Sequence, residues 1–178
     1  DTRIAYVPQK IDADRHLPIN FKNLLRAKAN VMQLGERDIH EAIMDVGLTP
    51  EILTTPVGHL SGGQFQRCLI TFALLGNPDV ILFDEPTASI DQTGEEQLYE
   101  LIHRLQDKRG ITVVVVSHDL SFVYRFATKV LCLNRQSICF GDPQDALTPD
   151  ILRKLYGEPF TYYHHVHEHD KIAKQKII

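Results

Sequence analysis

The sequence has no long hydrophobic run and no excess of positive charge. No stretch of its 178 residues stays apolar for the roughly 18–20 consecutive positions that a membrane-spanning helix needs. Its 19 lysines and arginines are outnumbered by 23 aspartates and glutamates, which gives a net charge of −4. Broad electrostatic binding to DNA or RNA needs a basic surface, so we expect no nucleic-acid partner. With 43% hydrophobic and 24% charged residues, the composition is typical of an ordinary globular domain.

Cysteine is also scarce, and its three residues lack the spacing of a disulfide framework, which indicates a reducing compartment. Two short apolar runs, 130–134 and 137–140, predict a β-hairpin. A two-residue loop between them would place Cys132 directly opposite Cys139. A disulfide fits that arrangement, but in a reducing cytosol we expect two packed thiols.

A third absence concerns the phosphate loop G-x-x-x-x-G-K-[ST], whose backbone N–H groups and lysine hold the phosphates of a bound nucleotide. No such string occurs in the chain. Its absence matters because two other segments indicate phosphate and nucleotide chemistry.

The first of these segments is residues 60–64, which read Leu-Ser-Gly-Gly-Gln. Ser61 and Gln64 have the spacing of a capping box, and an apolar helix is expected to follow. Gly62 and Gly63 let a ligand approach the backbone closely. The free N–H groups at such a helix start carry about half a positive charge, which suits a phosphate.

The second segment is residues 79–83, an apolar run from Val80 onward, which is followed directly by Asp84 and Glu85. The run is typical of a strand that is buried on both faces. Two acids at its end would cost stability unless a cation or a polar partner compensates them. Because neighbouring strand residues point to opposite sides, one carboxylate would face a metal ion and the other a water molecule. A phosphate cradle combined with this acid pair indicates nucleotide hydrolysis.

The remaining patterns predict an α/β fold with a mostly parallel sheet. A helix over 93–109, opened by a capping box at Thr93 and Glu96, lies between the strand 79–83 and a second apolar strand, 111–116, as in a crossover unit. Further elements are expected at residues 4–7 (a strand), 65–75 (a helix ended by Gly76), 120–126 (a helix capped by Asp119) and 148–157 (a helix from Thr148 to Gly157).

Five motifs resemble those of the ATP-binding-cassette (ABC) ATPases and occur in the same order as in that family. They are a Q-loop at Ala5–Gln9, the signature motif at Leu60–Gln64, a Walker B strand at Val80–Glu85, a D-loop at Ala88–Asp91 and an H-loop at Val113–Asp119. The D-loop reads Ala-Ser-Ile-Asp where the family usually has Ser-Ala-Leu-Asp, so its aspartate is kept. The resemblance implies a P-loop NTPase-like ABC ATPase domain, with a central parallel sheet and a helical signature subdomain.

An ABC ATPase also needs the missing phosphate loop, which is called Walker A in this family. We therefore expect an N-terminally truncated chain that lacks Walker A and its neighbouring strands and is inactive when isolated. A natural protein without Walker A is the less favoured alternative. We expect a partial ATPase domain at 1–157, with the helical subdomain at about 19–76 and the RecA-like part at 77–157, and a histidine-rich tail at 158–178.

The resemblance also implies catalytic roles. Asp84 would hold Mg²⁺, Gln9 would sense Mg²⁺ or the attacking water, and Glu85 would polarise that water. His118 would contact the γ-phosphate and order the catalytic carboxylate. Taken by position alone, His118 is more typical of a hydrogen-bonded structural histidine, and Gln9 of any loop glutamine.

In the family, two ATPase domains close head to tail around ATP. The resemblance implies that Asp91 contacts the opposite subunit and that the signature residues meet nucleotide held by that subunit. These nucleotide-binding residues are Ser61, Gly62, Gly63 and Gln64.

The tail carries His164, His165, His167 and His169 within six residues. Imidazoles at this density suit Zn²⁺, and a disordered polar tail is an equal alternative. Together with Tyr6–Lys10 and with Leu17 and Pro18, this tail resembles the ATPases of bacterial zinc importers.

The function implied is the ATPase subunit, a translocase, of a zinc importer, peripheral on the cytoplasmic face of the inner membrane. Its partners would be ATP, a second copy, a membrane permease and, indirectly, a periplasmic or surface metal-binding protein. An importer of manganese or iron is the next alternative. A non-transport ABC ATPase is a further candidate, and so is a regulatory or degenerate fragment whose tail senses metal.

Overall fold

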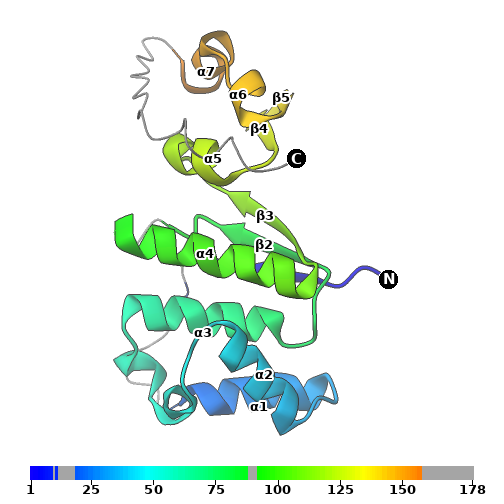
Figure 1. Ribbon diagram of the computed structural model, residues 1–178, viewed down its shortest axis with the longest axis vertical. Helices are drawn as coiled ribbons and strands as arrows, with labels where there is room; N and C mark the ends of the chain where they lie inside the picture. The colour runs from blue at the N-terminus through cyan, green and yellow to red at the C-terminus, as the bar shows by residue number, and fades with distance from the viewer. Residues whose placement is uncertain (10, 12–18, 88–91, 158–178) are drawn as a thin grey trace, which may run out of the picture. The chain divides into compact units, whose positions relative to one another are not determined.

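The computed structural model describes residues 1–9, 11, 19–87 and 92–157, and the chain divides into two compact units, Asp1–His118 and Asp119–Ile178 (Figure 1). The first unit contains β1 (Ile4–Val7), α1 (Phe21–Val31), α2 (Glu36–Asp45), the short 3-10 turns η1 (Pro50–Thr54) and η2 (Val57–His59), α3 (Gly62–Leu74), β2 (Val80–Asp84), α4 (Gln92–Arg109) and β3 (Thr112–Val116). The second contains α5 (Leu120–Phe126), β4 (Val130–Asn134), β5 (Gln136–Gly141), α6 (Pro143–Ala146) and α7 (Pro149–Tyr156).

The first unit is built on a parallel sheet in the order β1-β2-β3. Tyr6 pairs with Leu82, and Leu82 pairs with Val114. The β2–α4–β3 segment forms the expected crossover, and the strands lie within one residue of their predicted bounds. Because parallel strands run in one direction, their carboxyl ends meet at a single edge of the sheet.

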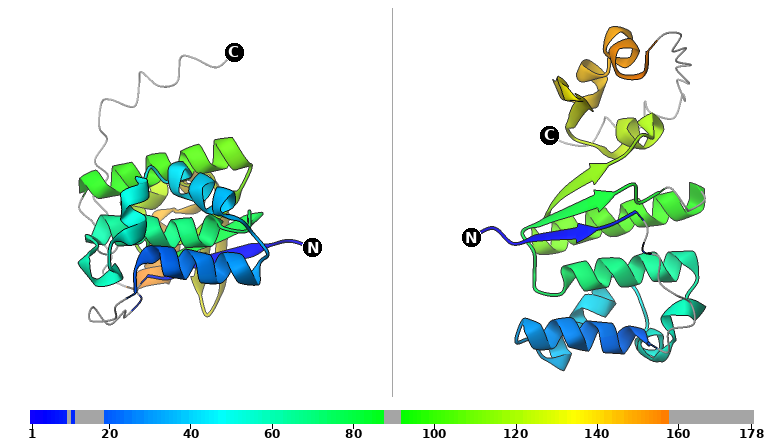
Figure 2. Two further views of the ribbon diagram at one scale, coloured as in Figure 1. Left: turned by 90° about the horizontal axis from the view of Figure 1, so that it is seen from below. Right: turned by 180° about the vertical axis from the view of Figure 1, so that it is seen from behind.

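One face of this sheet is covered by α3 and α4 (Figures 1 and 2). Alternate strand residues enter the core there, among them Val7, Ile81 and Phe83, beside Ile70 of α3 and Leu101 of α4. The other face alternates with it and carries large apolar side chains that stay exposed among the described residues, namely Ile4, Tyr6, Val114 and Val116.

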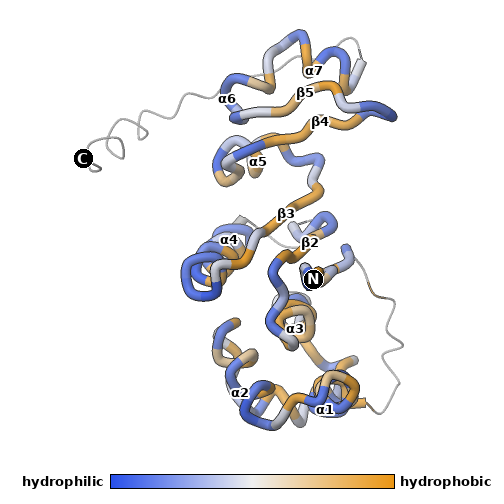
Figure 3. The backbone as a smooth tube through the Cα atoms, turned by 90° about the vertical axis from the view of Figure 1, so that its right-hand side faces the viewer, coloured by the Kyte–Doolittle hydropathy of each residue, from blue (hydrophilic) through white to orange (hydrophobic). Residues whose placement is uncertain are grey.

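The prediction that the strand at 79–83 is buried on both faces is therefore only half right for β2. The second apolar strand, β3, is exposed on one face. β3 is apolar after its first residue (Figure 3), yet its side chains alternate between half-buried and exposed. The physical reason is that α3 and α4 pack on the same face of the sheet. The apolar run thus predicted the strand correctly, but it did not predict which faces of the strand are buried by helices.

The helix boundaries follow from their caps. Gly47 and Gly76 have φ angles of +69° and +103°, so each ends its helix in a conformation that glycine adopts without strain. α4 begins at Gln92, which places Thr93 inside the first turn. The predicted capping position at Thr93 is thus wrong.

The second unit joins the β4–β5 hairpin to α5, α6 and α7 around Cys132, Leu147 and Leu152. The caps predicted at Asp119 and Thr148 are confirmed by hydrogen bonds from backbone N–H groups in the following turns. α6 was not predicted, although Asp142 followed by Pro143 is a usual helix start.

The hairpin departs from expectation in two ways. Asn134 pairs with Gln136, so the turn is formed by Arg135 alone, with a φ of +59°, and the register shifts between Cys132 and Leu133. Cys132 still pairs with Cys139, as predicted. The two are joined by a disulfide with a Cα–Cα distance of 4.8 Å, so the expected pair of thiols is wrong. Direct pairing across the strands brings these Cα atoms into the usual disulfide range.

Candidate functional site at the carboxyl ends of the strands

The sequence places its candidate acids at the carboxyl edge of the sheet. β2 ends at Asp84, Glu85 follows it, and His118 comes two residues after β3. Gln9 lies two residues after β1, and its side chain is exposed. The structure therefore brings three of the predicted site segments to one edge, because the strands that carry them are parallel and in register.

Asp84 is half-buried and receives a hydrogen bond from the neighbouring strand. The hydroxyl of Tyr6 donates to Asp84 Oδ2 at 2.9 Å. That bond, with smaller contributions from desolvation and from the charge of Asp84, raises the pKa of Tyr6. Sequence reasoning singles out Asp84 but gives Tyr6 no place in the site. The register, which sets Tyr6 beside Leu82, is the missing signal.

Glu85 lies beyond the strand and has its own partners. Its φ is +45°, in the left-handed region, and its N–H donates to the carbonyl of Val116 at 2.9 Å. Its Oε1 lies 2.8 Å from Nδ1 of His118. The Glu85 side chain is 18% exposed and that of His118 is 76% exposed. The pair thus joins a largely buried carboxylate to a ring that is accessible from outside.

This geometry corrects one step of the sequence argument. Simple strand alternation was expected to separate the two acids, but only Asp84 belongs to the strand. Glu85, the next residue, has a left-handed backbone conformation, which changes the direction of the chain. Asp84 is bonded to Tyr6 on one side, and Glu85 to His118 on the other. The two acids therefore have separate environments, as their predicted roles require.

The predicted capping box at the start of α3 is complete. Ser61 Oγ accepts from the Gln64 N–H at 3.2 Å, and Gln64 Oε1 accepts from the Ser61 N–H at 3.0 Å. All four residues from Ser61 to Gln64 are exposed. A Cβ atom added at Gly62 or at Gly63 would meet no heavy atom within 4 Å. The N-terminus of α3 is therefore open to a ligand or to another chain.

Some predicted residues fall outside the described parts of the chain. These are Asp91 of the D-loop and the tail residues His164, His165, His167 and His169. Among the residues that are described, no group of three or more His, Cys, Asp or Glu side chains is arranged to hold a metal ion. In the same part of the chain, no helix has both the length and the apolar character needed to cross a membrane.

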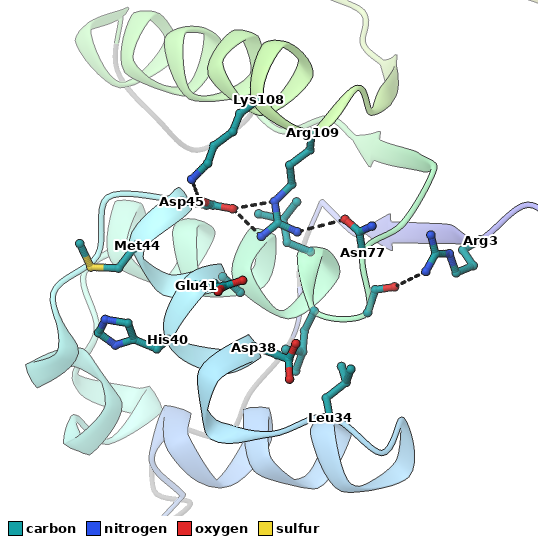
Figure 4. Close-up of a pocket in the computed structure, with 14 residues that line it drawn as sticks. Arg3, Leu34, Asp38, His40, Glu41, Met44, Asp45, Asn77, Lys108 and Arg109 are labelled. Atoms are coloured by element: carbon teal, nitrogen blue, oxygen red, sulfur yellow. Dashed lines mark hydrogen bonds and ion pairs between the residues drawn. The ribbon is translucent and has the colours of Figure 1, made fainter.

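A separate cavity of about 760 Å³ lies near the amino ends of the strands (Figure 4). Arg3 and Asn77 lie before β1 and β2, and Arg109 ends α4 just before β3. Asp45 of α2 binds Arg109 in its wall. The cavity is thus at the other end of the strands from the acid pair, and it is lined by ion pairs rather than by the predicted site residues.

The capping box makes a stability prediction. Ser61→Ala removes the acceptor for the Gln64 N–H, so we expect the free energy of unfolding to fall by about 1 kcal/mol, as for other lost N-caps. Ser61→Asp keeps an acceptor oxygen and should retain stability, while its charge would repel a phosphate. Urea unfolding followed by circular dichroism measures the free energy of unfolding of both variants. Equal loss in the two variants would contradict the capping role.

The fold and the site together define the class of the protein, an α/β domain of the P-loop NTPase type. Two comparisons with solved structures support this class. An inward-facing metal-chelate type ABC transporter is 25% identical, with a TM-score of 0.76, over 88% of this chain and 64% of that one. The protein cbiO1 from Clostridium perfringens, part of the ABC transporter complex cbiONQ, is 26% identical, with a TM-score of 0.69, over 80% and 58%.

Comparisons of the sequence identify the family. The ABC transporter family model matches residues 1–88. The zinc import ATP-binding protein ZnuC of Hydrogenovibrio crunogenus is 36% identical over 177 residues, which cover 93% of this chain and 68% of that protein. ZnuC of Brucella abortus is 37% identical over 99% of this chain, which spans 59% of that relative's length. The chain belongs to the family of ABC transporter ATP-binding proteins.

Proposed function

We propose that the chain forms part of the ATP-hydrolysing subunit of a bacterial ABC importer for a divalent metal, with zinc as the cargo. The single observation that carries the hydrolytic role is the 2.8 Å contact between Glu85 Oε1 and His118 Nδ1, directly after the half-buried Asp84. Relatives named zinc import ATP-binding protein, at 35–37% identity, support the choice of cargo.

Hydrolysis of ATP is a phosphoryl transfer, which needs a positioned water and stabilised charge more than covalent help. In the proposed mechanism Glu85 accepts a hydrogen bond from the attacking water and orients it. His118 holds Glu85 from one ring nitrogen, and its largely exposed ring contacts the γ-phosphate.

The donor set at the end of β2 fits a magnesium ion. Mg²⁺ takes one or two carboxylates together with phosphate oxygens and waters, and Asp84 is one carboxylate already oriented by a neutral donor. Asp84 would hold the ion and Gln9 would reach it from the end of β1. When bound, the ion supplies positive charge that neutralises the triphosphate.

A second copy of the subunit completes the site in this proposal. The open N-terminus of α3 offers the backbone N–H groups of its first turn and Ser61 to the γ-phosphate of nucleotide that the other copy holds. The two copies close head to tail when ATP binds and separate after hydrolysis. Asp91, outside the described residues, would contact the opposite copy.

The remaining partners follow from an importer role. The subunit would work at the cytoplasmic face of the inner membrane, bound to a permease, and a periplasmic or surface protein would deliver the metal. Gln9 would couple the site to that permease. The histidines at 164, 165, 167 and 169 would buffer zinc weakly near the subunit.

Growth under zinc limitation tests the function. Cells from which the natural gene is deleted should grow poorly with a zinc chelator and should take up less radioactive zinc. The full-length wild-type gene should restore both, and a Glu85→Gln copy should restore neither. If the deletion instead lowers manganese or iron uptake and leaves zinc uptake intact, zinc is not the cargo.

A further inference from the structure

We propose that Tyr6 is a positioning residue for the metal-binding carboxylate: its hydroxyl orients Asp84 so that the other carboxylate oxygen faces the cation. The inference rests on the proposed function, because it assumes that Asp84 binds magnesium. It gives a role to a residue of the Ala5–Gln9 segment, in which the family resemblance assigned a role to Gln9 alone.

The register of the sheet brings Tyr6 within reach of Asp84. Tyr6 pairs with Leu82, and Leu82 and Asp84 lie two positions apart on β2, so all three side chains share one face. Strand side chains lean along the strand direction, which lets a long side chain on β1 reach two positions further along β2. The 2.9 Å bond from the Tyr6 hydroxyl to Asp84 Oδ2 is the result.

Among the described residues, the strand on the other side of β2 offers Asp84 no side-chain donor. On the opposite side of β2, Asp84 pairs with Val116, and Val114 precedes it on the same face. Neither valine can donate a hydrogen bond from its side chain. Among the described residues, the side-chain hydrogen bond of the Asp84 carboxylate is the one from Tyr6.

The chemistry of the tyrosine hydroxyl suits the task of orienting a metal ligand. Carboxylates that ligate metals are themselves usually held by hydrogen bonds, which set their orientation. An arginine or a lysine in this place would cancel the charge that attracts the cation, whereas a tyrosine is neutral. The Tyr6 hydroxyl donates to Oδ2 of Asp84, and Oδ1 is the oxygen that would face the metal ion. Tyr6 thus orients the ligand without competing for the metal.

Tyr6→Phe tests the inference, because it removes the hydroxyl and keeps the ring. Mn²⁺ serves as the probe in place of Mg²⁺, and electron paramagnetic resonance measures its affinity for the full-length protein with a non-hydrolysable ATP analogue. We expect the Mn²⁺ dissociation constant to rise about tenfold, the lower end for residues that support a metal ligand. The Mg²⁺ concentration for half-maximal turnover should rise by a similar factor, and kcat at saturating Mg²⁺ should change less than about twofold.

Tyr124→Phe is the matched control. It also removes a tyrosine hydroxyl that donates a hydrogen bond, but its acceptor is the carbonyl of Leu147 in the second unit. We expect Mn²⁺ affinity to be unchanged in this variant. Unchanged Mn²⁺ affinity in Tyr6→Phe would overturn the inference. The resonance measurement needs no turnover. A protein that binds Mn²⁺ and nucleotide but transports no zinc would refute the proposed function, and the effect of Tyr6→Phe on Mn²⁺ affinity could still be interpreted.

Discussion

We expect Glu85→Gln to abolish steady-state ATP hydrolysis in the full-length protein and to leave ATP binding intact. We expect turnover to fall by about 10²–10⁴-fold, the usual contribution of a positioned general base. The amide has almost the same shape as the carboxylate, and its oxygen still accepts a hydrogen bond from Nδ1 of His118. What it loses is the negative charge that draws a proton from the attacking water.

The local fold should tolerate this change. The left-handed φ of +45° at residue 85 and the bond from its N–H to the Val116 carbonyl are backbone features, which the substitution leaves in place. Phosphate release measures the turnover, and equilibrium binding of a fluorescent ATP analogue measures the affinity. Because bound ATP is no longer consumed, the head-to-tail dimer should also persist, which sedimentation can detect.

The control is Glu100→Gln, which neutralises an exposed carboxylate on α4. It should change neither hydrolysis nor binding by more than about twofold, because an exposed charge away from the reaction contributes little. Hydrolysis that survives in Glu85→Gln at the wild-type rate would remove Glu85 from the role of base. Loss of ATP binding together with turnover would instead indicate a damaged fold.

Much of this site could be predicted from the sequence because its signals are local. The capping box of Ser61 and Gln64 depends on residues three positions apart, and the acid pair is adjacent in the chain. Neither prediction requires knowing which strands are neighbours. The contact of His118 with Glu85 also followed, but only through the family resemblance, because the two residues are 33 positions apart.

The features that the sequence did not reveal depend on pairing between distant segments. Tyr6 is 78 positions from Asp84, and no local pattern links them until the register of β1 and β2 is known. The exposed face of β3 was missed for a related reason, since an apolar run does not reveal on which face helices pack. The disulfide of the hairpin was not expected, because the prediction relied on a reducing compartment rather than on the pairing geometry of the two cysteines.

Asp45→Asn is the second change for which we expect a large effect, here on stability. Asp45 ends α2, and its side chain is only 4% exposed. It accepts hydrogen bonds from Arg109 Nε at 2.6 Å and from Lys108 Nζ, both at the end of α4 (Figure 4). Arg109 is itself 16% exposed and also reaches Asn77 at 3.4 Å, so the cluster links α2 to α4 and to the chain before β2.

Neutralising Asp45 leaves the guanidinium of Arg109 largely buried without its counter-charge. Breaking a fully buried pair costs about 3–5 kcal/mol, and we expect about 2–3 kcal/mol here because Lys108 remains in contact with water. Urea unfolding at neutral pH measures the loss. Glu41→Gln on the same helix is the matched control: its pair with Arg37 is exposed, so we expect a loss below about 0.5 kcal/mol.

The pH dependence of this loss identifies its cause. Burial would raise the pKa of Asp45, but the hydrogen bonds and charges of Lys108 and Arg109 outweigh it and hold that pKa below the ordinary 3.8. A carboxyl whose pKa is lowered by folding stabilises the protein fully above its ordinary pKa, and this stabilisation disappears as the pH falls through the lowered value. The difference in unfolding free energy between wild type and Asp45→Asn should therefore be constant from neutral pH to about pH 5 and should shrink below pH 3.8. A difference that stays the same at all pH values would mean that Asp45 acts through packing rather than through its charge.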